Sequence, residues 1–170
     1  AEFRNGEVVF GPGRLGQAIR FDGSGYLEAG DVAAFGYLDR FSLGAWIFPE
    51  NDEGVVLARE EDSADATGYS IVSTGGKLRL YLSNRRLDDA LRVETRESLA
   101  IKRWHHIMVT YDGTRMASGV KVYLNGRLVQ LNVLFDDLNQ SFSTREPLRI
   151  GSAGGSENRF QGLIDDVRIY

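Results

Sequence analysis

Hydrophobic residues recur at every second position along most of this chain, and this period of two constrains its fold more than any other feature of the sequence. The alternation runs through residues 41–48, 77–83, 106–111 and 120–124. Because successive side chains of a β-strand point to opposite faces of a sheet, each stretch predicts a strand with one apolar face toward a core. No segment carries an apolar stripe at the helical spacing of 3.6 residues.

Glycine-bearing turns separate the predicted strands, as at Asp22-Gly23, Gly75-Gly76, Asp112-Gly113 and Asn125-Gly126. These dipeptides supply the positive φ that tight hairpins need. Many short strands punctuated in this way predict an all-β fold, an antiparallel jelly-roll β-sandwich. We expect one domain over residues 1–170, excised from a larger protein because no initiator methionine opens it.

The composition and motif content exclude several classes of function. The absence of cysteine excludes a disulfide framework, a thiolate nucleophile and an iron–sulfur cluster. The net charge is −4 with no basic stripe, so we expect no nucleic-acid partner. No apolar run approaches the ~18 residues of a membrane span, so we expect no membrane insertion. Because the usual hydrolase and phosphate-loop signatures are also missing, we predict that the chain is not an enzyme.

The residues that point away from the core on the predicted strands are unusually aromatic. A sheet face in contact with water normally carries threonine, serine, lysine and glutamate. Flat apolar rings can instead stack on the C–H face of a sugar, while planar polar groups beside them bind its hydroxyls. The predicted ligand-binding residues are therefore Trp46, Arg79, Tyr81 and His106 on one sheet face, with Arg59 and Arg86 at its rim.

Two questions about this face stay open in the sequence. Loops could fold over it, and its aromatic side chains would then form a second small core. The 20 basic residues include only three lysines, which leaves 17 arginines. Arginine suits carboxylate, sulfate or phosphate groups, so the excess fits either an anionic ligand or the base composition of a genome.

Acidic residues near two turns predict a calcium site. Calcium takes six to eight oxygen ligands, often from carboxylates and turn carbonyls. The first and last strands of a sandwich commonly lie side by side, which would bring Asp22 close to Asp165 and Asp166. The alternative is that Asp22 caps its own turn and Asp165 binds backbone.

Five segments, taken in order, resemble a laminin-G-like module of the concanavalin A-like jelly-roll family. The resemblance extends over nearly the whole chain, and the segments that carry it are Leu15–Tyr26, Phe41–Pro49, the pair Trp104–Gly113 and Val120–Gly126, Leu148–Gly151 and Phe160–Tyr170. The resemblance implies a non-catalytic module of an exported or surface protein that binds glycans or proteins, often with a structural calcium. The catalytic Glu-x-Asp-x-Glu pattern of the glycosidase relatives is missing. Residues 86–95 and 138–142 resemble a subset found in large bacterial exported proteins.

Together these observations predict a non-catalytic, lectin-like carbohydrate-binding module of an exported multidomain bacterial protein. Its partners would be a glycan or polysaccharide and other domains of the parent protein. Its location would be the periplasm, the cell surface or the extracellular space. The first alternative is a structural or protein-interaction module that docks neighbouring domains. The second is a glycosidase or lyase on the same fold.

Overall fold

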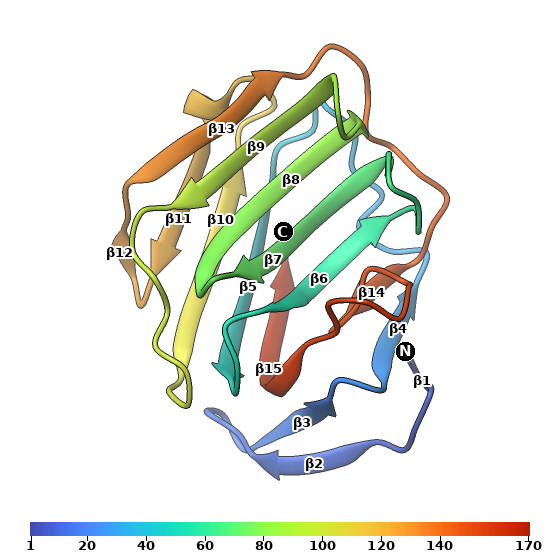
Figure 1. The fold of residues 1–170 in the computed structure, drawn as a ribbon, viewed down its shortest axis with the longest axis vertical. Helices are drawn as coiled ribbons and strands as arrows, with labels where there is room; N and C mark the ends of the chain where they lie inside the picture. Colours follow the sequence, from blue (N-terminus) through green and yellow to red (C-terminus); the bar gives the residue numbers. More distant parts are fainter.

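Fifteen strands form two antiparallel sheets that pack face to face (Figure 1), as a computed structural model of all 170 residues shows. The eight-stranded sheet contains, in spatial order, β1 (Glu2–Arg4), β4 (Tyr26–Gly30), β14 (Leu148–Ile150), β6 (Gly54–Glu60), β7 (Gly68–Thr74), β8 (Lys77–Arg85), β9 (Asp89–Thr95) and β13 (Leu131–Asp137). The seven-stranded sheet contains β12 (Arg127–Leu128), β11 (Val120–Leu124), β10 (His105–Tyr111), β5 (Phe41–Pro49), β15 (Gln161–Ile169), β3 (Gln17–Asp22) and β2 (Val9–Pro12). The predicted jelly-roll sandwich is confirmed.

The core lies between the sheets and is built by the alternation seen in the sequence. From the seven-stranded sheet, β5 buries every second residue from Phe41 to Ile47. From the eight-stranded sheet, β8 buries Leu78, Leu80 and Leu82 against it. The opposite parity of both strands points away from the core, as a strand with one apolar face requires.

Glycine turns connect the strands as predicted. Asn125 and Gly126 have φ values of 52° and 79°, and they join β11 to β12 in a two-residue hairpin loop. Two successive positive φ values give the turn a twist that matches that of the flanking strands.

The last strand is tied into the centre of the seven-stranded sheet. β15 pairs with β5 on one side and with β3 on the other. A bulge interrupts its pairing with β5 between Asp165 and Arg168, and Asp166 has a φ of 48° within it. The only helical element is the three-residue 3₁₀ turn η1 (Ala117–Gly119), and none of the structure's helices could cross a membrane.

Candidate functional site

The structure separates the aromatic residues that were expected on one face. Trp46 on β5 and His106 on β10 lie on the outer face of the seven-stranded sheet. Arg79 and Tyr81 on β8 lie on the outer face of the eight-stranded sheet, on the opposite side of the sandwich. The alternation assigned each residue to the correct side of its own strand. The prediction of a single shared face was wrong, because the sequence pattern does not tell which sheet a strand joins.

On the seven-stranded side, Trp46 is contacted by neighbours from its own chain. Its ring lies 5.1 Å from the ring of His106, which is its register partner on β10. The guanidinium of Arg14, from the β2–β3 turn, lies 5.2 Å from the Trp46 ring centroid. These contacts cover part of the indole, so this surface offers less free ring area than the sequence suggests.

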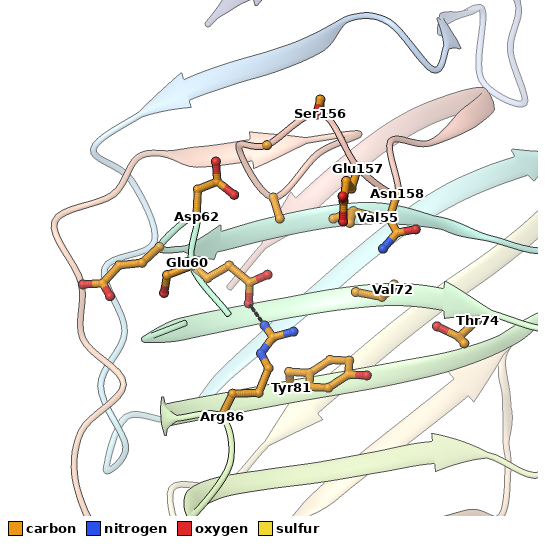
Figure 2. Close-up of a pocket in the computed structure, with 14 residues that line it drawn as sticks. Val55, Glu60, Asp62, Val72, Thr74, Tyr81, Arg86, Ser156, Glu157 and Asn158 are labelled. Atoms are coloured by element: carbon orange, nitrogen blue, oxygen red, sulfur yellow. Dashed lines mark hydrogen bonds and ion pairs between the residues drawn. The ribbon is translucent and has the colours of Figure 1, made fainter. Parts of the chain in front are cut away.

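On the eight-stranded side, Tyr81 borders a groove of about 430 Å³ (Figure 2). Outward-facing residues of β6 and β7 form its floor, and Tyr81 with Arg86 forms one wall. The loop of residues 153–158 forms the opposite wall, and residues 60–63 close one end. The lining residues are Val55, Glu60, Glu61, Asp62, Ser63, Val72, Thr74, Tyr81, Arg86, Ala153, Gly155, Ser156, Glu157 and Asn158.

A β-bulge builds the floor of this groove. Val55 and Glu60 are five positions apart on β6, so an unbroken alternation would put them on opposite faces. The pairing of β6 with β7 shifts between Val55 and Leu57, which leaves Val56 as the extra residue. Because a bulge adds one residue to one strand, Val55 and Glu60 both face the groove while Val56 and Leu57 pack in the core.

Small residues let the walls of the groove approach each other. Tyr81 lies opposite Ser70 in the register of β7 and β8, and this small side chain leaves room for Glu60 above it. At the closed end, a Cβ atom on Gly155 would lie 2.7 Å from Oδ1 of Asp62. A side chain at position 155 would therefore displace the exposed carboxylate of Asp62 from its place beside the 153–158 loop.

Glu60 is the central charged group of the groove. Its side chain is only 5% exposed, and its Oε2 accepts hydrogen bonds from Arg86 at 2.6 Å and from Ser70 Oγ at 2.9 Å. Burial raises the pKa of Glu60, and the nearby charges of Arg86 and Arg149 oppose this rise only in part. The guanidinium of Arg86 also lies 4.6 Å from the ring centroid of Tyr81, so one cation holds both the carboxylate and the ring in place.

The remaining predicted arginines are engaged elsewhere. Arg79 lies next to the groove but not in its lining, and its Nε donates to Glu94 at 2.6 Å. Burial opposes ionisation of Glu94, but Arg79 and Lys77 lower its pKa overall. Arg59 is only 2% exposed and lies on the core side of β6, so the prediction that it sits at a binding rim was wrong.

Arg59 instead ties two loops to the sheet. It donates to the carboxylate of Asp31 at 2.6 Å, to the carbonyl of Val32 at 2.7 Å and to the carbonyl of Thr144 at 3.2 Å. These acceptors belong to the segments that follow β4 and precede β14. Because a buried guanidinium must be satisfied by several acceptors, Arg59 has a structural role.

The three carboxylates proposed for calcium do not come together. Asp22 lies opposite Gln161 at one end of the β3–β15 pair, whereas Asp165 follows Ile164, which pairs with Ile19 toward the other end. The structure contains no group of three or more histidine, aspartate or glutamate side chains placed to hold a metal ion. The expectation that strand pairing brings Asp22 next to Asp165 was therefore wrong, although β3 and β15 do pair.

Each of these carboxylates has its own local partner. Asp22 Oδ1 accepts hydrogen bonds from Ser24 N at 2.8 Å and Ser24 Oγ at 2.6 Å, and these bonds lower the pKa of Asp22. Asp165 Oδ2 accepts from the backbone N–H of Leu15 at 2.8 Å, and Asp166 pairs with Arg168 at 3.0 Å. Each of the three residues thus has a partner within the chain, and calcium binding stays a prediction.

Comparison with known proteins places this fold in a family. Residues 21–170 match the sequence profile of the concanavalin A-like lectin/glucanases superfamily, which is most of the chain. The chain belongs to this superfamily. Among curated proteins, no sequence shows significant similarity to it.

Several solved structures share the fold of this chain at low sequence identity. Domain 4 of an extracellular arabinanase from Geobacillus stearothermophilus, solved with arabinotriose, has a TM-score of 0.69 and 20% identity over 97% of this chain and 75% of its own. The binding domain of paraclostridial mosquitocidal protein 1 has a TM-score of 0.70 and 18% identity, with coverages of 99% and 44%. Domains LG4–5 of the mouse laminin α1 chain have a TM-score of 0.63 and 16% identity over 89% of this chain and 40% of their own. This chain thus spans less than half of the latter two.

Several groove residues of this concanavalin A-like module were missed in the sequence. Residues 60–67 are polar and typical of a loop, and nothing in their sequence indicates that Glu60, Glu61 and Asp62 line the groove. The opposite wall, residues 153–158, contains the run Gly-Gly-Ser-Glu-Asn, which signals a loop but not its position. The available signal was the sequence Glu-Glu-Asp directly after an apolar strand, since polar groups at strand ends often line surface sites.

Proposed function

We propose that this chain is a non-catalytic glycan-binding module of an exported multidomain protein, and that the groove beside Tyr81 is its binding site. The observation that carries this proposal is the combination of one aromatic wall with a mainly polar lining in a cavity of about 430 Å³. A sugar ring has an apolar C–H face and a hydroxyl periphery, so a binding site needs these two elements side by side.

The lining offers the hydrogen-bonding groups that such a ligand requires. Thr74, Ser156 and Asn158 carry neutral donors and acceptors, and Glu60 is fixed beside Tyr81 through Arg86. Pre-fixed side chains lose little conformational freedom when a ligand binds, which favours affinity. The arabinanase domain captured with arabinotriose shares this fold, and it supports a glycan as the ligand class.

Affinity electrophoresis in gels that contain arabinan, galactan, xylan, laminarin or glucomannan tests the proposal. We expect at least one polysaccharide to retard the chain and Tyr81→Ala to abolish the retardation. Trp46→Ala is the matched control, because Trp46 is also an aromatic residue with an arginine over its ring, but it lies on the opposite outer face. Loss of binding in Trp46→Ala with normal binding in Tyr81→Ala would move the site to the Trp46–His106 surface.

Glu60 has one property of a general acid, since burial raises its pKa and it lies in a groove. Glycoside hydrolysis needs an acid that can hand its proton to the leaving oxygen. Here Oε2 is already held by Arg86 and Ser70, an arrangement that favours the ionised form and a binding role. Release of reducing sugars from a retarding polysaccharide, lost in Glu60→Gln, would contradict the non-catalytic assignment.

A second candidate function is docking of neighbouring domains of the same polypeptide. The hairpin that starts with β2 exposes Val9 by 51%, Phe10 by 56% and Leu15 by 58%. Phe10 also borders a mainly apolar cavity of about 320 Å³ that includes Ile19 and Leu27. Apolar surface of this kind favours a protein contact. If this apolar surface docks a neighbouring domain, Phe10→Ser should weaken the contact between the two domains in the full-length parent protein without affecting glycan retardation.

A further inference from the structure

We infer that the groove is selective for charge: it takes uncharged, hydroxyl-rich sugars and rejects glycans that carry carboxylate or sulfate groups. This inference rests on the proposed function and adds the class of glycan. It also answers the question raised by the arginine-rich composition, because an anionic ligand needs a cation that is free to meet it.

No free cation lines the groove. Arg86 is the only basic residue of the lining, and it is already paired with Glu60 at 2.6 Å and stacked on Tyr81. Arg79, beside the groove, pairs with Glu94 at 2.6 Å. Arg149 donates to the backbone carbonyls of Glu60 at 3.2 Å and Ala153 at 2.9 Å. An anionic sugar would therefore have to break an existing pair to gain an arginine.

Free carboxylates line the groove instead. Glu61, Asp62 and Glu157 form no salt bridge with any residue of the chain. Ionised carboxylates only accept hydrogen bonds, and each has about four lone-pair sites. They therefore match the hydroxyl groups of a neutral sugar, which can donate.

The side chain of Glu60 independently indicates a ligand that donates hydrogen bonds. Its side chain is 95% buried, since only 5% is exposed, and both of its hydrogen bonds end on Oε2. Oε1 accepts no hydrogen bond within the chain, although Glu60 belongs to the groove lining. Oε1 still reaches solvent, so it is free to accept a hydrogen bond from a sugar hydroxyl in the groove.

Coulomb repulsion sets the size of the effect. A ligand anion about 7 Å from each of three carboxylates in a water-like dielectric should bind roughly tenfold more weakly than a neutral sugar at 10 mM salt. The difference should shrink as the ionic strength rises, because the Debye length falls to about 8 Å at 0.15 M. Charge selection and its salt dependence are thus measurable together.

The experiment compares neutral and anionic polysaccharides in affinity gels at 10 mM and 300 mM NaCl. The neutral set is β-1,4-galactan, glucomannan and hydroxyethyl cellulose, and the anionic set is polygalacturonate, alginate and carboxymethyl cellulose. We expect retardation by a neutral member and at least fivefold weaker retardation by its anionic counterpart at low salt. Equal or stronger retardation by the anionic set refutes charge selection but leaves glycan binding intact. Retardation by neither set refutes glycan binding, and charge selection with it.

A charge-neutralised variant locates the effect in the groove. Asp62→Asn combined with Glu157→Gln should reduce the ratio between neutral and anionic binding by at least about twofold at low salt. The matched control, Glu2→Gln with Glu7→Gln, makes the same change in net charge on exposed carboxylates outside the lining. It should leave the ratio unchanged. An equal change in both double variants would show that net charge alone, and not the groove, sets the preference.

Discussion

The ion pair between Arg86 and Glu60 gives the sharpest test of how the groove is held together. In Arg86→Met, the carboxylate of Glu60 keeps its buried position but loses its charged partner. Removing one member of a fully buried pair typically costs 3–5 kcal/mol. The Arg86 side chain is 25% exposed, so water screens part of the interaction. We expect a loss of about 2–3 kcal/mol in the free energy of unfolding at pH 7.5.

The same variant makes a prediction about pH. The pKa of Glu60 is already raised by burial, and removal of Arg86 raises it further. A carboxyl whose folded pKa exceeds its unfolded pKa contributes stability below the unfolded value, and this stability is lost as the pH rises through the folded value. The cost of Arg86→Met should therefore fall below about 1 kcal/mol at pH 4, where Glu60 is largely protonated. Carboxyls with lowered pKa values, such as Asp22, titrate alike in both proteins and cancel in the difference.

Urea unfolding at pH 4 and at pH 7.5 measures both differences, and two further variants provide controls. Arg127→Met breaks an ion pair whose side chains are 66% and 42% exposed, and it should cost no more than about 1 kcal/mol at either pH. Adding Glu60→Gln to Arg86→Met should restore most of the lost stability, because no buried charge is left unpaired. If Arg86→Met loses the same stability at both pH values, the desolvated carboxylate is not the cause.

Three further predictions concern residues away from the groove. Arg59→Met should lower the free energy of unfolding by about 3 kcal/mol without affecting glycan retardation, because the buried guanidinium makes three charge-assisted hydrogen bonds that the variant loses; unchanged urea unfolding would contradict this. Gly126→Val should cost about 1–2 kcal/mol, since φ at this position is 79°, and Lys121→Val on the neighbouring strand is its control in thermal melts. If calcium binds the native chain, adding EDTA must lower Tm; an unchanged Tm in excess calcium and in EDTA would remove Asp22, Asp165 and Asp166 as candidates.

The sequence could predict the strands and turns because these depend on local chemistry. The alternation in residues 41–48 sets which side chains of β5 enter the core, and Asn125-Gly126 sets the hairpin that follows β11. Neither feature needs information from a distant part of the chain. The fold class follows from the number and spacing of such elements, so it could be read before any contact was known.

The site could not be predicted in the same way, because it depends on which strands become neighbours. Trp46 and Tyr81 both point away from the core on their own strands, yet β5 and β8 belong to different sheets. The outward-facing residues of β6 could not be predicted for another reason. All seven residues of this strand are buried, so its sequence shows no alternation. The bulge at Val56 then reverses the side on which Val55 lies relative to Glu60. One extra residue therefore decides the composition of the groove floor.

The arginine residues show why composition alone misleads about a ligand. Arginine suits an anionic ligand only where its guanidinium is free, and pairing within the fold decides whether it is. Arg59, Arg79 and Arg86 each meet a carboxylate of the chain at 2.6 Å. The acids that pair with them come from other strands or loops, so a sequence count of basic residues cannot detect their neutralisation. The unpaired charges that line the groove are the carboxylates of Glu61, Asp62 and Glu157. Their negative charge is opposite to the positive charge that the arginine count suggested.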